Sequence, residues 1–358
     1  MKLILDAMGG DHAPHAMLEG AVKALPELAQ EDGELVLVGD ERVIRPLLKK
    51  RRFRPLEEAL QGTRFKISLI HSSQTIEMDD SIRAVRSKPE ASINIGCELA
   101  AKSYAERSPA AFISAGHSGA MMASALLAMG RLAGAERPAI AVKLPTLSPD
   151  GCVLLDVGAN VDCKPEHLRD FAIMGAVFAK VERQSEGLPR VGILSNGEER
   201  TKGNELSRSA LELIEKLPCF SGENPIGQFI GNVEGKEMFK GKVDVVVTDG
   251  FVGNVVLKSL ESLGSAFVTM IKNEAKHSVL APLGFLLASG VFMKLKRKLD
   301  YAETGAAPLL GVAGYAFICH GRSNSKAIKN ALLRARSALR DQFVERLEKA
   351  LKGQLAKT

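Results

Sequence analysis

The stretch that decides the fold is residues 2–11, KLILDAMGGD, in which an apolar run ends in an aspartate and a glycine-rich turn. A helical pattern follows at residues 14–29, and this order of apolar run, glycine-bearing loop and helical pattern recurs along the chain. Further apolar runs lie at residues 35–38, 65–70, 111–114, 152–156, 191–194 and 243–248. Continuous apolar runs are typical of strands buried on both faces, as in parallel sheets.

Helical patterns separate these runs, at residues 91–106, 117–133, 165–182, 203–217 and 251–275. Such alternation predicts an α/β fold with a mostly parallel sheet. A composition of 46% hydrophobic and 25% charged residues excludes disordered and fibrous classes. With 358 residues, we expect one catalytic unit over residues 1–358, large enough for two lobes.

Charge and cysteine content narrow the class of protein. The net charge of +6 favours an acidic partner, but the densest basic run, residues 49–54, carries no nucleic-acid-binding signature. We therefore expect a solvated helix end there and no nucleic-acid partner. Five scattered cysteines without a CxxC pair indicate reduced thiols, and no secretory signal is recognisable, so we expect a cytoplasmic protein.

Polar loops that contain glycine follow the predicted strands, at residues 6–11, 114–119, 156–160, 195–199 and 248–254. Because the carboxyl ends of parallel strands share one edge of a sheet, we expect these loops to line one crevice. Most lead into a helix N-terminus, where free N–H groups favour an anion, and glycine lets a backbone approach a phosphate closely. The loops therefore predict an anion-binding active site.

Common cofactor and metal motifs are absent. No Walker A or GxGxxG sequence occurs at the required place, so we expect no cofactor. Residues 116–119, GHSG, lack one residue of a nucleophile elbow, which disfavours Ser118 as an acyl-enzyme nucleophile. Asp11 precedes Pro14 and a helical pattern, so we interpret it as a helix N-cap and predict no metal site with Asp6, His12 and His15.

An ordered set of segments runs through nearly the whole chain: DAMGGD (6–11), SAGHSGA (114–120), LDVGANVDC (155–163), NGEERTKGN (196–204), GNVEG (231–235), TDGFVGNVVLK (248–258) and LLGVAGYAFICHGRS (309–323). This set resembles the signature loops of the PlsX family of phosphate acyltransferases. The resemblance implies a three-layer α/β/α fold like those of isocitrate and isopropylmalate dehydrogenases and of phosphotransacetylases, assembled as a homodimer.

The resemblance also implies a reaction. A long-chain fatty acyl group would move from acyl-[acyl-carrier-protein] to inorganic phosphate, giving acyl phosphate for phospholipid synthesis. A glycerol-3-phosphate acyltransferase that consumes acyl phosphate would be a further partner. A phosphotransacetylase-like enzyme that uses acyl-CoA and a non-catalytic membrane-associated scaffold remain alternatives. His117 departs from the family, since relatives usually have Asn in this loop, and imidazole can titrate near neutral pH.

Phosphate that attacks a thioester must be held against the carbonyl carbon. Residues 79–93 also resemble the family, and Arg86 and Lys88 are the preferred cationic ligands, with surface helix-end cations as the alternative. The predicted phosphate- and substrate-binding residues are Asp6, Gly9, Gly10, Asp11, Arg86, Lys88, Ser114, Gly116, Ser118, Gly119, Asp156 and Gly158.

The developing oxyanion and the leaving thiolate need hydrogen-bond donors. We predict His117, Asn160 and Asn254 for this role, with Asp249 as a further catalytic residue that orients them. Asp156 has a second interpretation, as the cap of the helix that starts near Pro165. His320 is a candidate general acid, although a buried structural histidine is the favoured interpretation.

The most apolar run, residues 279–293, is too short and too broken by proline and glycine to span a membrane, which needs about 20 residues. A basic segment follows it, so we expect a protruding hairpin at residues 271–300 that contacts a membrane peripherally or packs against a partner subunit. The predicted membrane contacts are Leu283, Phe285, Leu286, Leu287 and Phe292. Residues 323–352 predict a C-terminal amphipathic helix.

Overall fold

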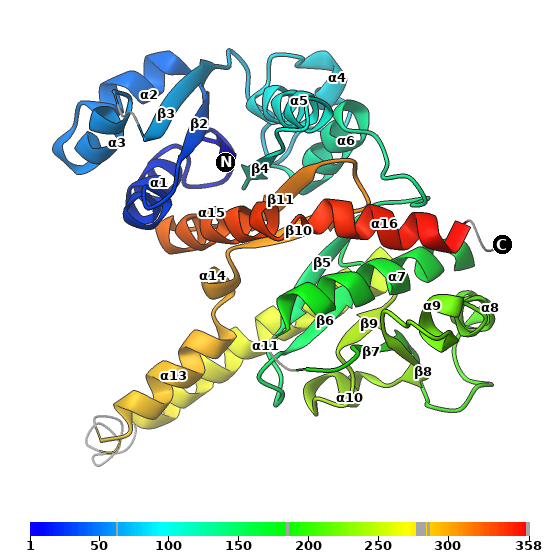
Figure 1. Cartoon of the computed structure of the whole chain (residues 1–358). Helices are drawn as coiled ribbons and strands as arrows, with labels where there is room; N and C mark the ends of the chain where they lie inside the picture. Colours follow the sequence, from blue (N-terminus) through cyan, green and yellow to red (C-terminus); the bar gives the residue numbers. More distant parts are fainter. Residues whose placement is uncertain (62–63, 184–185, 277–283, 285–286, 356–358) are drawn as a thin grey trace.

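The computed structural model describes residues 1–61, 64–183, 186–276, 284 and 287–355 (Figure 1). Within these residues the strands are β1 Lys2–Asp6, β2 Gly33–Gly39, β3 Phe65–His71, β4 Ala110–Ser114, β5 Ala139–Leu144, β6 Cys152–Leu155, β7 Arg190–Leu194, β8 Gln228–Val233, β9 Val245–Val247, β10 Ala306–Leu310 and β11 Tyr315–Cys319. They form one mixed sheet in the order β3-β2-β1-β4-β11-β10-β5-β6-β9-β7-β8. The prediction of an α/β fold with a mostly parallel sheet is confirmed.

Helices cover both faces of this sheet (Figure 1). The longer ones are α1 His15–Leu28, α2 Glu41–Leu48, α5 Ser92–Ala105, α6 Ser118–Ala128, α7 Pro165–Glu182, α8 Glu205–Glu215, α11 Gly250–Lys276, α13 Ser289–Leu299, α15 Ser325–Arg340 and α16 Phe343–Leu355. The short ones are η1 Arg51–Phe53, α3 Arg54–Ala59, α4 Ala84–Ser87, α9 Pro218–Ser221, α10 Gly235–Phe239 and α14 Tyr301–Thr304.

The buried side chains of β1 show why the sheet needs a helical layer on each face. Leu3 and Leu5 belong to a core that includes residues of α1, α7, α15 and α16. Ile4 belongs to a second core, which includes residues of α5, α6 and α11. Because successive strand side chains point to opposite faces, a strand that is apolar at every position is buried only between two layers.

Two antiparallel strands reverse half of the sheet. β10 pairs antiparallel with both β11 and β5, and β5 pairs antiparallel with β6. The strands β6 to β9 therefore run opposite to β1, β2, β3, β4 and β11. The expectation that all strand-exit loops share one edge was wrong, because the predicted strands did not include β5 and β10. The loops after β1, β4 and β11 lie at one edge, and those after β6, β7 and β9 lie at the other.

The C-terminal stretch forms two helices, so the expectation of one continuous helix over residues 323–352 was wrong. α15 ends at Arg340, α16 begins at Phe343, and Gln342 between them has a φ of 49°. The change of direction places the Phe343 ring edge-on against Phe178 of α7, with ring centroids 5.4 Å apart. The turn at Gln342 therefore lets α16 pack against α7.

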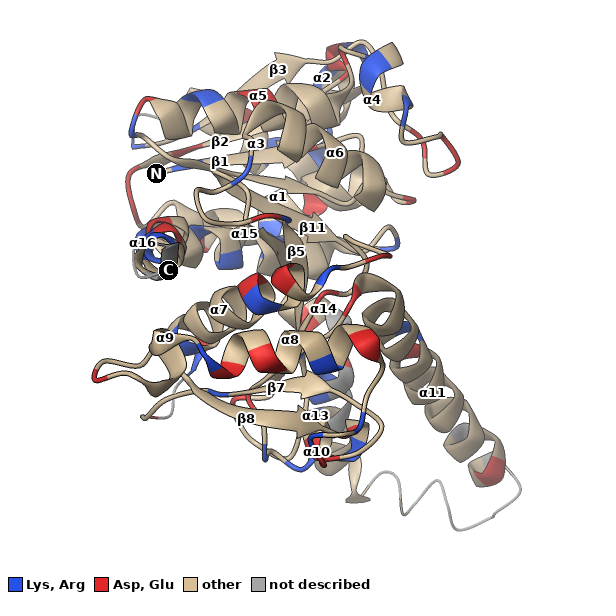
Figure 2. Cartoon of the chain, turned by 90° about the vertical axis from the view of Figure 1, so that its right-hand side faces the viewer, with Lys and Arg blue, Asp and Glu red and all other residues tan. Residues whose placement is uncertain are grey.

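The distal part of α11 and α13 project from the body, and residues 262–276 and 287–299 are called the arm here (Figures 1 and 2). Residues 262–271 carry no charged side chain, and Leu263, Phe267 and Met270 are more than half exposed. Leu287 is 81% exposed and Phe292 39%. The other predicted membrane contacts, Leu283, Phe285 and Leu286, lie outside the described residues. Among the helices that are described, none is both long and apolar enough to cross a bilayer.

Candidate functional site

The first loop group consists of the loops after β1, β4 and β11, residues 7–11, 115–117 and 320–323. Asp6, at the end of β1, is fully buried beneath it. Its Oδ1 accepts hydrogen bonds from Met8 N and Gly9 N, both at 3.0 Å, and its Oδ2 accepts one from Ser114 Oγ at 2.7 Å. Burial raises the pKa of Asp6, and these hydrogen bonds oppose the rise.

Glycines let these loops approach one another closely. A Cβ atom on Gly9 would lie 2.4 Å from Asp6 Oδ2 and 2.7 Å from Gly116 N, so a larger residue does not fit without a shift. Gly10 has a φ of 100°, which favours glycine. Asp11 N donates to Gly321 O at 2.8 Å and joins the β1 loop to the β11 loop. The structure therefore brings together the predicted residues Asp6, Gly9, Gly10, Asp11, Ser114 and Gly116.

α6 begins at the same edge. His117 is its N-cap, and the Nδ1 atom of His117 accepts a hydrogen bond from Ala120 N at 3.1 Å. Because Nδ1 is an acceptor, the neutral ring carries its proton on Nε2. Ser118 is exposed and Gly119 follows it in the first turn. The N-terminus of this helix offers backbone N–H groups and a positive dipole end to an anion.

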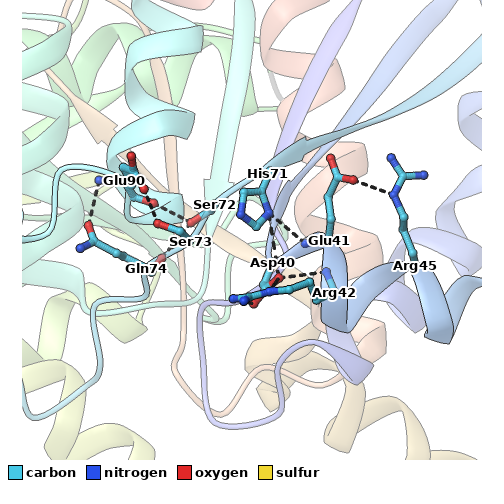
Figure 3. Close-up of polar contacts among 9 residues, drawn as sticks. All are labelled: Asp40, Glu41, Arg42, Arg45, His71, Ser72, Ser73, Gln74 and Glu90. Carbon is cyan, nitrogen blue, oxygen red and sulfur yellow. Dashed lines mark hydrogen bonds and ion pairs between the residues drawn. The ribbon is translucent and has the colours of Figure 1, made fainter.

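The segment 72–91 is anchored beside this edge, at the ends of β2 and β3 (Figure 3). The Ser72 hydroxyl lies 2.8 Å from the carbonyl oxygens of both Gln74 and Glu90, and Gln74 Oε1 accepts from Glu90 N at 3.0 Å. Next to it, Glu41 N donates to His71 Nδ1 at 3.2 Å (Figure 3). These bonds fix both ends of the segment.

The two predicted cations of this segment differ in their surroundings. Lys88 Nζ donates to Asp80 Oδ2 at 2.6 Å and to Thr75 O at 2.9 Å, so Lys88 holds the segment in shape. Its hydrogen bond lowers the pKa of Asp80. Arg86, on α4, is exposed. The segment approaches the first loop group through Met78, since a Cβ atom on Gly321 would lie 3.1 Å from Met78 Cε. It approaches α6 through Ile82, since a Cβ atom on Gly119 would lie 3.2 Å from the Ile82 side chain.

The second loop group consists of the loops after β6 and β9, residues 156–160 and 248–254. Asp156 is fully buried in this group, and its carboxylate accepts hydrogen bonds from several backbone N–H groups. Its two oxygens accept from Ile140 N at 3.0 Å, Gly158 N at 3.2 Å, Ala159 N at 3.0 Å and Asn160 N at 2.7 Å. Burial raises the pKa of Asp156, and the hydrogen bonds oppose the rise. The interpretation of Asp156 as a cap of α7 was wrong, because Lys164 is the N-cap of that helix.

Asn160 links the two loops of the second group. Its Nδ2 donates to Pro138 O at 2.7 Å and to Asp156 Oδ2 at 2.9 Å, which uses both amide hydrogens within the protein. The backbone carbonyl oxygen of Asn160 accepts from Gly250 N at 2.7 Å, at the start of α11. In this conformation Asn160 therefore fixes the loop geometry.

Asp249 and Asn254 form the beginning of α11. Asp249 Oδ1 accepts from Val252 N at 2.8 Å, in the manner of a helix cap. Asn254 is exposed, and its side chain lies beside Gly158, where an added Cβ atom would be 3.8 Å from Asn254 Cβ. Of the two predicted oxyanion donors in this group, Asn160 and Asn254, it is therefore Asn254 that lies at the surface.

α11 connects the two loop groups. Lys258 lies one turn after Asn254 on the same helix face, and its Nζ is 3.5 Å from His320 Nε2 in the loop after β11. The predicted catalytic residues are therefore divided: His117 lies in the first group, and Asn160, Asp249 and Asn254 lie in the second. Lys258 was not among the predicted site residues, although it lies four residues after Asn254 within residues 248–258.

The loop after β7 takes part in neither group. Asn196 Oδ1 accepts from Gly203 N at 2.9 Å within this loop, and Asn232 of β8 donates to Glu199 O at 2.8 Å. A separate pocket of about 350 Å³ lies beside it, lined among others by Arg200, Phe220 and Phe229. In the part of the chain that is described, no group of three His, Cys, Asp or Glu side chains is placed to bind a metal.

Comparison with known proteins shows which family the chain belongs to. A family model described as fatty acid synthesis protein matches residues 1–346. The phosphate acyltransferase of Heliobacterium modesticaldum is 45% identical over 356 residues, which cover 99% of each chain. That of Wolinella succinogenes is 42% identical over 350 residues, 98% of this chain and 97% of the relative. The chain belongs to the PlsX family of phosphate acyltransferases. As a PlsX-family protein it is an acyltransferase.

The fold of this PlsX-family chain is similar to those of solved phosphotransacetylases. A phosphotransacetylase from Streptococcus pyogenes superposes with a TM-score of 0.57 at 16% identity, covering 95% of this chain and 94% of that one. The EutD phosphotransacetylase from Staphylococcus aureus gives a TM-score of 0.55 at 14% identity, covering 94% of each chain. At identities this low, the superpositions establish a common fold alone. The expectation of a phosphotransacetylase-like fold is confirmed.

Proposed function

We propose that the protein transfers a long-chain fatty acyl group from acyl-[acyl-carrier-protein] to inorganic phosphate, giving acyl phosphate for phospholipid synthesis. The observation that carries the proposal is the first loop group of a phosphate acyltransferase-family chain, where close-packed glycine loops meet the N-terminus of α6. Such an arrangement suits an inorganic anion, because the N–H groups and the positive dipole end at a helix N-terminus favour negative charge.

In the proposed reaction, a phosphate oxygen attacks the thioester carbonyl carbon and forms a tetrahedral oxyanion. The carbon–sulfur bond then breaks, so that the acyl group leaves on phosphate and the carrier thiolate takes up a proton from water. Phosphate is itself the nucleophile, and the protein needs no covalent intermediate. Its task is to hold phosphate against the carbonyl group and to stabilise the oxyanion.

Several of the predicted site residues have a proposed part in this scheme. His117 belongs to the first loop group, and we assign it the role of an Nε2–H donor, because its Nδ1 accepts from Ala120 N; Asn254 offers an exposed amide on α11. Asp6 and Asp156 position the glycine loops by accepting hydrogen bonds from the backbone N–H groups of these loops. Arg86 is the proposed cation for the phosphate, since its guanidinium is exposed, whereas Lys88 is bound to Asp80.

The assay that tests the proposal identifies the acyl donor. The purified protein is incubated with phosphate and either long-chain acyl-carrier protein or long-chain acyl-CoA, and acyl phosphate is trapped with hydroxylamine. We expect hydroxamate from the carrier-protein donor alone. Hydroxamate from acyl-CoA alone would instead support the phosphotransacetylase-like alternative, and none from either donor would support the non-catalytic scaffold.

We also propose that the protein is a cytoplasmic homodimer that contacts the membrane through the arm. The arm combines exposed apolar side chains, such as Phe267 and Leu287, with Lys294, Arg297 and Lys298 on α13. Apolar residues next to basic ones suit the surface of an anionic bilayer. Delivery of acyl phosphate at that surface would place it near a glycerol-3-phosphate acyltransferase that consumes it.

A further inference from the structure

The turn at residues 77–83 leaves two large apolar side chains open to solvent. Met78 is 49% exposed and Ile82 is 51% exposed. The other large apolar side chains of the segment 72–91, all of whose residues are described, are buried. The turn is otherwise polar, with the sequence EMDDSIR. A single exposed apolar residue is ordinary, but two of them beside a candidate active site form a surface that a ligand can cover.

The ends of both side chains lie against glycines of the candidate site. A Cβ atom on Gly321, in the loop after β11, would lie 3.1 Å from Cε at the tip of Met78. A Cβ atom on Gly119, in the first turn of α6, would lie 3.2 Å from Cδ1 at the tip of Ile82 and 3.1 Å from His117 Cε1. The two apolar side chains therefore border the first loop group, one at the β11 loop and the other beside the N-cap of α6.

Hydrogen bonds on both sides of the turn hold it in place. Glu77 N donates to Asp80 Oδ2 at 2.8 Å, and the same oxygen accepts from Lys88 Nζ at 2.6 Å. Asn94 of α5 is buried, and its Nδ2 donates to Val85 O and to Lys88 O, both at 2.9 Å. The backbone that carries the two apolar side chains is thus braced from within the segment and from the neighbouring helix. Side chains presented in this way suit the recognition of a substrate.

We propose that Met78 and Ile82 contact the carbons of the acyl chain that follow the thioester carbonyl group, and that this contact favours a long chain over an acetyl group. The proposal rests on the proposed function, in which the first loop group holds the phosphate. Since the carbonyl carbon must then lie against the phosphate, the next carbons of the chain lie close to the same glycines. Exposed apolar side chains at that place remove the chain from water, which stabilises the bound substrate.

Kinetics with palmitoyl and acetyl groups on the same donor test this selection. The full-length variants M78Q, I82N and M78Q/I82N replace apolar side chains by polar ones of similar size. We expect the ratio of kcat/KM for palmitoyl to kcat/KM for acetyl to fall about tenfold in the double variant, with the KM for phosphate unchanged. M78L and I82V keep an apolar surface, so we expect them to retain most of the ratio. L127Q is the matched control, because Leu127 is an apolar residue of α6 that is 62% exposed.

Photocrosslinking tests the contact without any turnover. A long-chain fatty acid with a diazirine next to its carboxyl group is mixed with the wild type and phosphate and is irradiated, and mass spectrometry locates the label. We expect label on residues 77–83.

The outcomes separate this inference from the proposed function. Label confined to other segments, or no label, would overturn the inference. An unchanged ratio in M78Q/I82N, or an equal loss with both acyl groups, would also overturn it, and an equal loss would place the carrier or its pantetheine arm at the turn. Either result together with hydroxamate from the wild type leaves the proposed function intact. Label on the turn without hydroxamate from either donor would defeat the proposed function alone.

Discussion

The hydroxyl group of Ser114 donates a hydrogen bond to the carboxylate of Asp6 at 2.7 Å, and both side chains are buried. The bond joins the carboxyl ends of the adjacent strands β4 and β1. Ser114 Oγ in turn accepts from Gly116 N at 3.0 Å, so the geometry of two loops depends on one carboxylate. A buried network of this kind is stabilising only while each member keeps its partner.

Replacement of Asp6 by Asn tests this dependence. D6N turns one acceptor oxygen into a donor, so one polar group of the network loses a partner, and we expect the free energy of unfolding to fall by about 1–3 kcal/mol. Urea unfolding followed by circular dichroism measures the change. D32N is the control, because Asp32 is 86% exposed and pairs only at the surface with Arg64. Equal stability of D6N and D32N would contradict a structural role for the Asp6 carboxylate.

Substitution of Gly9 by Ala probes the close approach of the first two loops. The added Cβ atom meets Asp6 Oδ2 at 2.4 Å and Gly116 N at 2.7 Å, so the loops must move apart. We expect G9A to lower both stability and turnover. G264A on α11 is the matched control, since a Cβ atom there meets nothing within 4 Å and alanine favours a helix by about 0.5–1 kcal/mol. Normal turnover in G9A would show that the reaction does not need this contact.

Asn254→Ala tests the proposed oxyanion donor of the second loop group. Removal of such a donor typically lowers turnover about 10²–10³-fold, and we expect this loss in kcat while the unfolding transition stays unchanged, because Asn254 is exposed. The hydroxamate assay gives the rate. Ser259→Ala, an exposed polar residue further along α11, serves as the control. A loss of only about twofold would remove Asn254 from the catalytic residues.

The repeated order of apolar run, glycine loop and helix predicted the fold class and the strands β1 to β4, β6, β7 and β9, because a parallel strand buried on both faces is apolar at every position. The reversal between the halves was not predictable in the same way. It depends on β5 and β10, and β10 contains Pro308, which interrupts an apolar pattern. Hence loop composition identified Asp6 and Asp156 as notable residues but did not indicate that they lie at opposite edges.

The electrostatic coupling of His320 to Lys258 predicts a shift in the imidazole titration. Lys258 lowers the pKa of His320, so K258M raises it toward the ordinary value of 6.5, whereas burial and Arg322 still hold it below that value. NMR titration of the His320 Cε1–H signal measures the shift, with K66M, which removes an exposed lysine on β3, as the control. An unchanged pKa in K258M would mean that the two groups are not coupled in solution.

The same coupling has a consequence for stability. A histidine whose folded pKa is lowered contributes stability that is present above its unfolded pKa of 6.5 and is lost as the pH falls through the folded pKa. Because K258M brings the folded pKa closer to 6.5, we expect the variant to lose less stability than the wild type over this window. Urea unfolding at pH values across it measures the difference.

Acidic substitutions on the arm test membrane contact. Leu287 and Val291 are 81% and 70% exposed, and the double variant L287E/V291E places two negative charges where an anionic bilayer would approach. We expect the wild type to co-sediment with anionic vesicles at low salt and the variant to remain in the supernatant, with hydroxamate formation in solution retained. L147E is the matched control, since Leu147 is 84% exposed on the body. Co-sedimentation of L287E/V291E equal to that of the wild type would exclude this part of the arm as the membrane contact. Light scattering of both proteins decides whether the arm also holds a dimer, because a halved mass in L287E/V291E would place the subunit contact there.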